Sequence, residues 1–586
     1  MSIHTRVRKI HRRNHVISDE LRQASLHPVL KRIYANRDIS GLCQLDYSLN
    51  RLINYNQLKG IDAAADLVAD AVINNQAILI VGDYDADGAT STALVVRALR
   101  RFASGHVGYL VPNRFEYGYG LTPEIVAVAA DYSPALLITV DNGISSIDGV
   151  RAAKQRGIKV VITDHHLPAE RLPDADAIVN PNQPGCPFAS KSIAGVGVAF
   201  YLMLAVRGAL RARAWFNEQR LEPNMAELLD LVALGTVADV VPLDENNRIL
   251  VQQGIRRIRA GKACAGIRAL FQAAGREITR CSSTDLGFFI GPRLNAAGRL
   301  EDMSAGVECL TTDSAATAEA IASELNELNS QRKNIEQGML TEALADMEAL
   351  LVTLETDQLQ AGVCLYNSDW HQGVIGLLAS RIKERFHRPV VAFANAKDDA
   401  DSDEIKGSAR SIHGLHIRDV LDAIASRHPG LIQKFGGHAM AAGLSISKHN
   451  YEAFKQAFEQ EVAALLSEEA LEEVVETDGG IEADQMSLET AQVIETAGPW
   501  GQHFPEPVFD NRFEVLNWKV VGDKHLKMQL RLDQGNKTVD AIAFNTLADD
   551  LPASEHVHVA YRLNVNEFRN NRSLQLIVDC MRAGGQ

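Results

Sequence analysis

Residues 77–88 read AILIVGDYDADG, a short apolar run followed by a glycine and three alternating aspartates. Four comparable apolar runs follow, at residues 107–112, 135–140, 159–163 and 177–181. Each run is rich in Val, Ile and Leu without alternation, which is typical of strands buried on both faces of a parallel sheet. The stretches between the runs have the length and apolar spacing of helices. This β–α alternation predicts a doubly wound α/β domain with a parallel sheet.

Potential metal ligands and their neighbours stand at the ends of these runs and of a further apolar segment, residues 231–243. They are Asp83, Asp85, Asp87, Asp141, Asp164, His165, His166 and Asp239. Ligands of open α/β sheets bind beyond the carboxyl ends of the strands. We therefore expect these side chains to converge in one crevice and to form the catalytic site.

The residue types in this cluster predict divalent cations. Carboxylates with one or two imidazoles and no thiolates suit Mn²⁺ or Mg²⁺. So many acids in one crevice would raise each other's pKa, and two divalent cations would relieve the repulsion. Two cations roughly 3.5 to 4 Å apart can share a carboxylate and clamp a phosphate for in-line displacement. The sequence thus predicts metal-dependent phosphodiester chemistry.

Each part of the cluster, taken alone, also fits a different role. The DxDxDG string also begins an EF-hand loop, but its twelfth position is Leu94 where a glutamate should stand. An aspartate after a strand, such as Asp141, is often only a helix N-cap, and adjacent histidines are often packing residues. The chain has no GxSxG elbow and no GxxxxGK[ST] loop. We interpret the GVG of AGVGVAF (194–200) as helix packing.

The bulk composition sets further limits. The 586 residues predict several domains, with 46% hydrophobic and 23% charged residues, as in soluble proteins. The net charge of −15 argues against nonspecific duplex binding, although basic residues gather at the N-terminus (Arg6, Arg8, Lys9, Arg12 and Arg13). Seven scattered cysteines without a CxxC pair indicate a reducing cytoplasm. We find no secretory signal and no apolar run long enough for a membrane span.

The pattern along the chain predicts five segments. They are a basic helical segment (1–60), the α/β catalytic domain (61–311), a long helical connector (312–350), a second α/β domain (351–466) and a terminal β-barrel (467–586); the resemblance described below implies that the second α/β domain binds substrate and that the barrel binds nucleic acid. The last segment alternates like five strands with turn signals between them, which is compatible with an OB fold or with another small antiparallel barrel.

Several strings resemble one known family. Asp164-His165-His166, preceded by GDYDADG, is similar to the DHH phosphoesterase superfamily. GPRLNAAGRL (291–300), WHQGVIGLLASRI (370–382), GSARS (407–411) and FGGHAMAAG (435–443) resemble the motifs of its RecJ nucleases, in the order that this family uses. The resemblance covers most of the chain. It implies a DHH domain, a DHH-associated domain and a C-terminal OB fold.

The resemblance also implies roles for individual residues. Asp85, Asp87, Asp141, His165 and Asp239 match metal ligands, with Asp141 as the bridge. His166 matches a histidine that faces the scissile phosphate, Asp164 would orient a histidine, and Asp83 is an additional acid. The residues implied to bind substrate are Arg114, Arg293, Asn295, Arg299, Ser408, Arg410, Gly436, Gly437 and His438. Of these, Ser408, Arg410 and Arg114 would hold a 5′-phosphate.

The activity implied by the resemblance is a 5′-to-3′ exonuclease on single-stranded DNA. It would release 5′-mononucleotides by two-metal-ion hydrolysis, in DNA repair and recombination. Trp518, Phe544 and Phe568 are candidates for stacking on bases. The resemblance also implies a cytoplasmic monomer, with a helicase and a single-strand-binding protein as partners and no contact with a membrane. One rival hypothesis is a hydrolase of short oligonucleotides or cyclic dinucleotides, whose known examples are usually shorter and lack the terminal barrel. The other is a non-catalytic single-strand binder or replication scaffold, which should lack metal ligands.

Overall fold

The structure is a computed structural model of the chain. It describes residues 8–113, 117, 120–353, 360–396, 403–467, 469–522, 525–546, 551–552, 554–568 and 571–584. The chain divides into two compact units. The first, called the N-terminal unit here, holds residues 16–330 and 493–506. The second, the C-terminal unit, holds residues 331–492 and 507–586 together with the beginning of the chain through His15.

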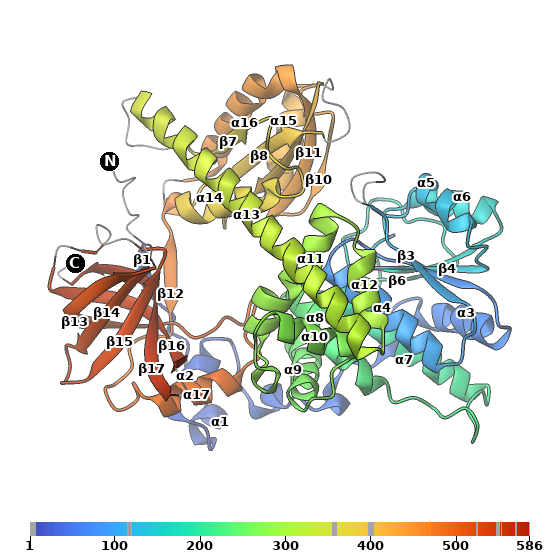
Figure 1. Cartoon of the computed structure of the whole chain (residues 1–586), viewed down its shortest axis with the longest axis horizontal. Helices are drawn as coiled ribbons and strands as arrows, with labels where there is room; N and C mark the ends of the chain where they lie inside the picture. Colours follow the sequence, from blue (N-terminus) through green and yellow to red (C-terminus); the bar gives the residue numbers. More distant parts are fainter. Residues whose placement is uncertain are drawn as a thin grey trace. The chain divides into compact units, whose positions relative to one another are not determined.

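A five-stranded parallel sheet forms the centre of the N-terminal unit (Figure 1). Its strands are β2 (Ile78–Val81), β3 (Val107–Leu110), β4 (Leu136–Val140), β5 (Lys159–Thr163) and β6 (Ala177–Val179). They lie in the order β3-β2-β4-β5-β6, and every pairing is parallel. After β2 the chain adds β3 on one side and β4 on the other. The boundary between β2 and β4 is therefore the switch point at which such sheets bind ligands.

Helices cover both faces of this sheet, as the doubly wound prediction requires. On one face, Leu79, Leu137 and Val160 pack against α5 (Pro123–Ala130) and α6 (Ile147–Gln155). The other face contacts α3, α4 and α7, whose bounds are Ile61–Ile73, Ala86–Arg101 and Gly195–Ala212. By length and composition alone α7 could cross a membrane, but 67% of it is buried inside the fold. This is the position of a core helix.

A helical layer follows the sheet in the chain. It comprises α8 (Leu229–Ala238), α9 (Glu245–Arg259), α10 (Ala265–Ala273), α11 (Gly291–Leu300) and α12 (Ser304–Thr311). A π-helix, η6 (Asp285–Ile290), leads directly into α11. The expectation that Asp239 follows a strand is wrong, because Asp239 is the C-cap of α8. Nearly all residues of α8 are apolar or glycine, so its composition could not distinguish a buried helix from a buried strand.

The long connector is α13 (Ala315–Thr353), which runs for 39 residues and begins in the N-terminal unit. The α/β sheet of the C-terminal unit has the order β10-β11-β9-β8-β7. Its strands are β7 (Val363–Tyr366), β8 (Val390–Asn395), β9 (Glu404–Arg410), β10 (Lys434–Gly437) and β11 (Ala441–Ser447). Helices α15 (Ile417–Arg427) and α16 (Tyr451–Leu465) pack on the face that carries Ile405 and Ala409. Helix α14 (Ile375–Phe386) also contacts β8 and β9, near Ser408 and Arg410.

Five further strands of the C-terminal unit close into a barrel in the order β13-β14-β15-β17-β16. They are β13 (Phe509–Val521), β14 (His525–Leu532), β15 (Thr538–Phe544), β16 (His556–Phe568) and β17 (Asn571–Ala583). Only the β15–β17 pairing is parallel. Helix α17 (Leu488–Ala497) precedes the barrel in the chain.

The N-terminal segment differs in part from the helical expectation. It contains α1 (Asp19–Gln23) and α2 (Pro28–Ala35), but it begins with a strand, β1 (Lys9–Arg12), which pairs in parallel with β12 (Val474–Thr477). Its basic side chains meet acids there: Arg8 lies 2.8 Å from Glu473, and Arg12 lies 2.6 Å from Asp510. The described residues of this basic cluster thus neutralise carboxylates of the same unit. They do not form an open basic surface.

Candidate metal centre

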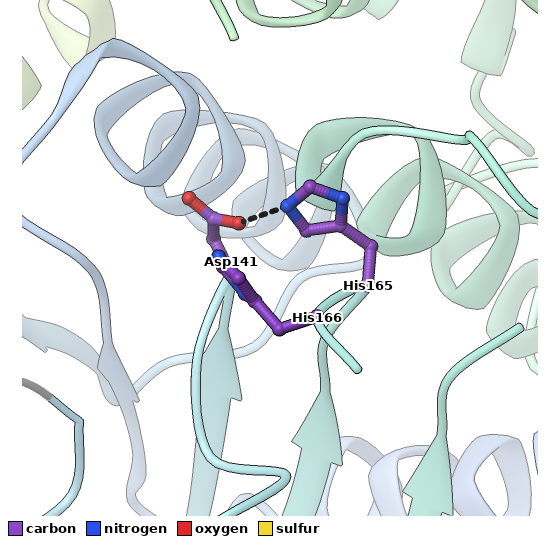
Figure 2. Close-up of side chains that lie close together, drawn as sticks. All are labelled: Asp141, His165 and His166. Carbon is purple, nitrogen blue, oxygen red and sulfur yellow. Dashed lines mark ion pairs between the residues drawn. The ribbon is translucent and has the colours of Figure 1, made fainter. Parts of the chain in front are cut away.

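The centre begins where β4 and β5 end side by side. Asp141 follows β4 directly in the left-handed region, with φ of 62°, a conformation that aspartate tolerates better than most residues. His165 follows β5, and its Nε2 lies 3.1 Å from Asp141 Oδ1 and 3.5 Å from Asp239 Oδ2. Figure 2 shows the side chains of Asp141 and His165 pointing toward each other, with His166 beside them. Three segments far apart in the sequence therefore contribute to one cluster.

The loop after β2 supplies three more carboxylates. Asp85 is the N-cap of α4, because its Oδ1 accepts hydrogen bonds from the N–H groups of Asp87 and Gly88 at 2.9 and 3.0 Å. One carboxylate oxygen of Asp85 therefore holds the helix, and the other can face a ligand. Asp83, Asp85 and Asp141 each offer an oxygen within 4.8 Å of the others. The spacing of the DYDADG string thus serves both the helix start and the acidic cluster.

Asp87 is fixed by the beginning of α7. Its Oδ2 accepts a hydrogen bond from Gly195 N–H at 2.6 Å, and its Oδ1 accepts one from Val196 N–H at 2.9 Å. The interpretation of this GVG string as mere helix packing is therefore incomplete. Gly197 does pack against Ile193, but Gly195 lies in the site. A glycine immediately before a predicted helix was the available signal, because free N–H groups at a helix start favour anions.

Asp239 completes the cluster from the end of α8. Asp87, His165 and Asp239 each offer a ligand atom within 4.8 Å of the others. Within the described part of the chain, the buried Oδ2 of Asp239 accepts no hydrogen bond. The next residue, Val240, has φ of 60°, which is strained for a β-branched side chain. Such strain is found mainly where the surrounding fold holds a functional residue in place.

Hydrogen bonds with neighbouring residues fix the positions of His165 and His166. Asp164 Oδ1 lies 2.7 Å from His166 Nδ1, and Asp164 Oδ2 accepts a hydrogen bond from Ile144 N–H at 2.9 Å. Asn180 and Asn182, just after β6, donate to the carbonyl oxygens of His166 and His165 at 3.0 and 2.6 Å. Asn180 and Asn182 are not among the predicted site residues. Asn180 lies near the end of the fifth apolar run, residues 177–181, and Asn182 directly follows it, so the rule that polar residues at strand ends form the site would have identified them.

The crowded acids shift each other's titration. Burial, followed by the charge of Asp85, raises the pKa of Asp87 to about 7, although its two N–H donors oppose the shift. Burial and then the charges of Asp87 and Asp85 raise the pKa of Asp239 well above its usual value, and the same causes act on Asp141. Burial of His166 opposes its charged form, but the hydrogen bond and charge of Asp164 prevail and raise its pKa to about 9.

These residues fit divalent cations. The groups within ligand distance contain carboxylate oxygens and imidazole nitrogen and no sulfur, which is the donor set of Mn²⁺ and Mg²⁺. Burial, and after it the charges of Asp87 and Asp85, raises the pKa of Asp141 and of Asp239, and a bound cation would supply the counter-charge that these acids need. A buried Asp239 oxygen that accepts no hydrogen bond from the described residues is a suitable ligand atom. The positions of these ligand atoms and their negative charge therefore both fit a site for divalent cations.

Three residues expected to bind substrate lie on α11 in the same unit. The guanidinium of Arg293 is buried, and it donates to Phe289 O at 2.6 Å and to Asn326 Oδ1 at 3.1 Å. Asn295 Oδ1 accepts from Ala86 N–H at 2.8 Å and so supports the start of α4 beside Asp85. Arg299 is half-buried in the last turn of α11. The expected Arg114 lies outside the described residues.

The remaining expected substrate residues meet on one sheet of the C-terminal unit. Ser408 on β9 pairs with Gly443 on β11, which pairs with Gly436 on β10. Arg410 donates to Ser408 Oγ at 3.0 Å. Gly437 has φ of 143°, and His438 N–H donates to Ala441 O at 2.8 Å to close the turn between β10 and β11.

The first turn of α14 comes close to these polar groups. A Cβ on Gly376 would lie 2.7 Å from Arg410 Nη2 and 2.9 Å from Ser408 Oγ. Glycine is therefore required for this approach, which brings the backbone of a helix start beside a hydroxyl and a guanidinium. Gly376 lies within the motif WHQGVIGLLASRI (370–382), but it is not among the predicted site residues.

Comparison with known proteins supports the same picture. The chain matches the models of the DHH family, N-terminal domain (residues 77–236), the DHHA1 domain (358–464) and the RecJ OB domain (477–579). The single-stranded-DNA-specific exonuclease RecJ of Salmonella typhimurium is 53% identical over 559 residues, which cover 95% of this chain and 96% of the relative.

Two solved structures are similar over nearly the whole chain. RecJ of Thermus thermophilus in complex with Mn²⁺ has a TM-score of 0.82 and 29% identity, and the match covers 99% of this chain and 81% of that chain. The same protein with Mg²⁺ has a TM-score of 0.75 and 27% identity, with 99% and 79% covered.

Fold and site together define a metal-dependent nuclease of the DHH type. Its cations are Mn²⁺ or Mg²⁺, as the donor set predicts and as the related structures contain. The chain belongs to the RecJ family. The predicted architecture of a DHH domain, a helical connector, a DHH-associated domain and a terminal OB domain is confirmed.

Proposed function

We propose that the protein is a 5′-to-3′ exonuclease specific for single-stranded DNA, which releases 5′-mononucleotides by two-metal-ion hydrolysis. The observation that carries this proposal is the convergence of Asp141, His165 and Asp239 from β4, β5 and α8. The relatives named above act on single-stranded DNA, and they match this chain along nearly its entire length.

Five residues would hold the cations: Asp85, Asp87, Asp141, His165 and Asp239. Asp141 lies within ligand distance of both the Asp83–Asp85 group and the two histidines, which suits a carboxylate shared by two ions. Bound cations would activate water and neutralise the charge that develops on the phosphate. Asp83 stands beside Asp85 as a further acid.

The protein itself supplies a proton donor and a rigid frame. His166 pairs with Asp164, and its pKa of about 9 keeps it protonated at neutral pH. A protonated His166 can donate a hydrogen bond to an oxygen of the scissile phosphate, where charge accumulates during the reaction. Asn180 and Asn182 hold the backbone of both histidines, so the imidazoles do not need to be ordered when substrate binds.

Recognition of the 5′ end is assigned to the C-terminal unit. Ser408, Arg410 and Arg114 would hold the terminal phosphate, with the backbone of Gly436 and Gly437 and the side chain of His438 beside them. Arg293, Asn295 and Arg299 would contact phosphates of the strand. Guanidinium and backbone N–H groups are the usual partners of phosphate oxygens. The barrel would bind the following bases, and Trp518 and Phe544 are 46% and 51% exposed there. The side chain of Phe568 lies outside the described residues.

The cellular setting is part of the same proposal. It is a cytoplasmic monomer that acts in DNA repair and recombination, with a helicase and a single-strand-binding protein as partners. The cytoplasmic location agrees with seven free cysteines, six of them buried or half-buried. The domain boundaries at residues 60, 311, 350 and 466 also stay part of the proposal, although the boundary at 350 falls within α13.

The test of the activity is a single substitution in the centre. Asp141→Ala should abolish Mn²⁺-dependent release of mononucleotides from a long 5′-phosphorylated strand and should leave binding of that strand nearly unchanged. Cleavage by this variant at the wild-type rate would refute the site. A dinucleotide offered in parallel separates the proposed enzyme from a hydrolase of short oligonucleotides, since only the latter would prefer it.

A further inference from the structure

A second polar cavity lies within the N-terminal unit, away from the metal centre. It has a volume of about 170 Å³ and lies among the end of α4, the start of α8, the end of α9 and the start of α10. Helices α4 and α8 connect the two places. Asp230, in the cavity wall, and Asp239, in the metal centre, are nine residues apart on α8, which corresponds to about 13 Å of helix. The cavity is therefore distinct from the metal centre.

Five cationic side chains line the cavity: Arg97, Arg101, Arg257, Lys262 and Arg268. Two of them are neutralised by surface acids. Arg97 lies 2.6 Å from Asp313, and Arg101 lies 3.3 Å from Glu227. Both acids lie at the surface: Asp313 is largely exposed, and Glu227 is half-exposed.

The remaining three cations face one carboxylate of the wall, Asp230, whose charge interacts with that of Arg257. Across the described ranges, Arg257 and Lys262 form no ion pair, and the buried Nε of Arg257 donates no hydrogen bond. Arg268 donates to a backbone oxygen, Ala263 O, at 2.7 Å. These three side chains leave positive charge in a hollow of a chain whose net charge is −15.

The buried acid of the wall, Asp230, is already satisfied by amide groups. It accepts hydrogen bonds from Cys264 N–H at 2.7 Å and from Leu231 N–H at 3.0 Å. These bonds join the start of α10 to α8, so Asp230 has a structural role. The first turn of α10 adds the positive end of a helix dipole to the same wall.

We propose that this cavity binds the phosphate group of a small ligand, either inorganic phosphate or the phosphate of a 5′-mononucleotide. A guanidinium and an ammonium group are the side chains that match a phosphate dianion. The volume lies below the roughly 300 Å³ at which pockets begin to enclose drug-sized ligands, so the ligand is small or only its phosphate enters. The proposal does not depend on the nuclease mechanism.

The test measures binding to metal-free protein, so that catalysis plays no part. Inorganic phosphate and thymidine 5′-monophosphate are titrated by calorimetry in EDTA, against wild type, Arg257→Ala and Lys262→Ala. Each substitution should weaken binding at least tenfold. Arg256→Ala is the matched control, because this neighbouring arginine on α9 is exposed and does not line the cavity. It should bind as wild type does.

The remaining outcomes are decisive. Tighter binding of the nucleotide than of phosphate identifies the nucleotide as the ligand, and equal binding identifies phosphate itself. Equal affinity in wild type and Arg257→Ala, or no binding at ~10 mM phosphate, overturns the proposal. A 5′-hydroxyl oligonucleotide is a third probe. If Arg257→Ala weakens its binding and leaves phosphate binding unchanged, the cavity belongs to the path of the DNA strand and the proposal fails.

Discussion

Gly195 and Asp141 are in such close contact that no side chain fits between them. A Cβ at position 195 would lie 2.5 Å from Asp141 Oδ1 and 2.7 Å from Asp141 Cβ. The same residue donates its N–H to Asp87. The first turn of α7 therefore sets the position of two carboxylates of the metal centre at once, one through a hydrogen bond and the other through contact.

The first prediction concerns this contact. Gly195→Ala should lower the rate of Mn²⁺-dependent strand hydrolysis by about 100-fold, because a displacement of a reacting group by about 1 Å has that effect. The fold should survive, since one methyl group is added. Gly338→Ala is the matched control: position 338 lies within α13, and the added Cβ would have no atom of another described segment within 4 Å, so activity should be unchanged. Wild-type activity of Gly195→Ala would contradict the role assigned to α7.

The second prediction concerns pH in the absence of metal. Folding raises the pKa of Asp87 to about 7 and raises that of Asp239, whereas unfolded carboxyls titrate near about 3.9. The folded state therefore holds protons that the unfolded state has released, and its stability falls as pH rises through this range. In EDTA, we expect the Tm to fall by at least ~3 °C between pH 5.5 and pH 8.5.

Two comparisons check the origin of this effect. Saturating Mn²⁺ should remove the fall and raise the Tm more at pH 8.5 than at pH 5.5, because ligands must lose their protons to bind. Asp239→Asn should flatten the metal-free profile, since one shifted carboxyl is gone. Calorimetric scans that show the same slope for Asp239→Asn and wild type would rule out the acid cluster as the cause.

The third prediction concerns the N-terminal strand. The side chain of Asp510 is fully buried on β13 and accepts hydrogen bonds from Arg12 at 2.6 Å, Thr477 at 2.6 Å and His558 at 2.8 Å. Burial would raise the pKa of Asp510, but the bonds from His558, Arg12 and Thr477 outweigh it and lower the pKa. Asp510 therefore stabilises the folded state above about pH 4, which is the pKa of an aspartate in the unfolded chain. This stabilisation is lost as the pH falls through the lower pKa that Asp510 has in the folded state.

Asp510→Ala should therefore reduce the free energy of unfolding at pH 7 by about 3 kcal/mol, because it leaves buried donors unsatisfied. Urea unfolding followed by tryptophan fluorescence, to which Trp518 on the same strand contributes along with three other tryptophans, measures this change. Glu476→Gln removes an exposed pairing with Arg13 and should change the stability by less than about 1 kcal/mol. Equal effects of the two substitutions would show that the Asp510 network contributes no more than a surface pair.

The fourth prediction tests recognition of the 5′ end. Gly376→Ala would place a Cβ 2.7 Å from Arg410 Nη2 and should displace the guanidinium. We expect the KM for a 5′-phosphorylated strand to rise about tenfold or more, corresponding to the loss of one charge-assisted hydrogen bond. The KM for a 5′-hydroxyl strand should change little, and it serves as the internal control. Equal rises for both substrates would mean that Gly376 supports the fold and not the phosphate site.

Much of the fold could be predicted from the local pattern of apolar and polar residues. The apolar runs at 78–81, 136–140 and 159–163 are buried parallel strands in the structure, and α13 occupies the predicted connector. These predictions succeed because burial on both faces requires continuous apolar residues, and a long breaker-free polar stretch favours a helix. The pattern failed at Asp239, because a short buried helix such as α8 has the same composition as a buried strand.

The sequence by itself determined the chemistry available to this protein: carboxylates and imidazoles without thiolates, placed where strands end, and the glycines that close approach requires. Tertiary structure alone decided which groups fix these residues: the backbone of α7 holds the carboxylate of Asp87, and the side chain of Asn180 holds the backbone carbonyl of His166. It alone decided that Arg12 neutralises Asp510. The reason is physical: side-chain type is a local property, whereas hydrogen bonds and charge pairs depend on distances between separate segments of the chain.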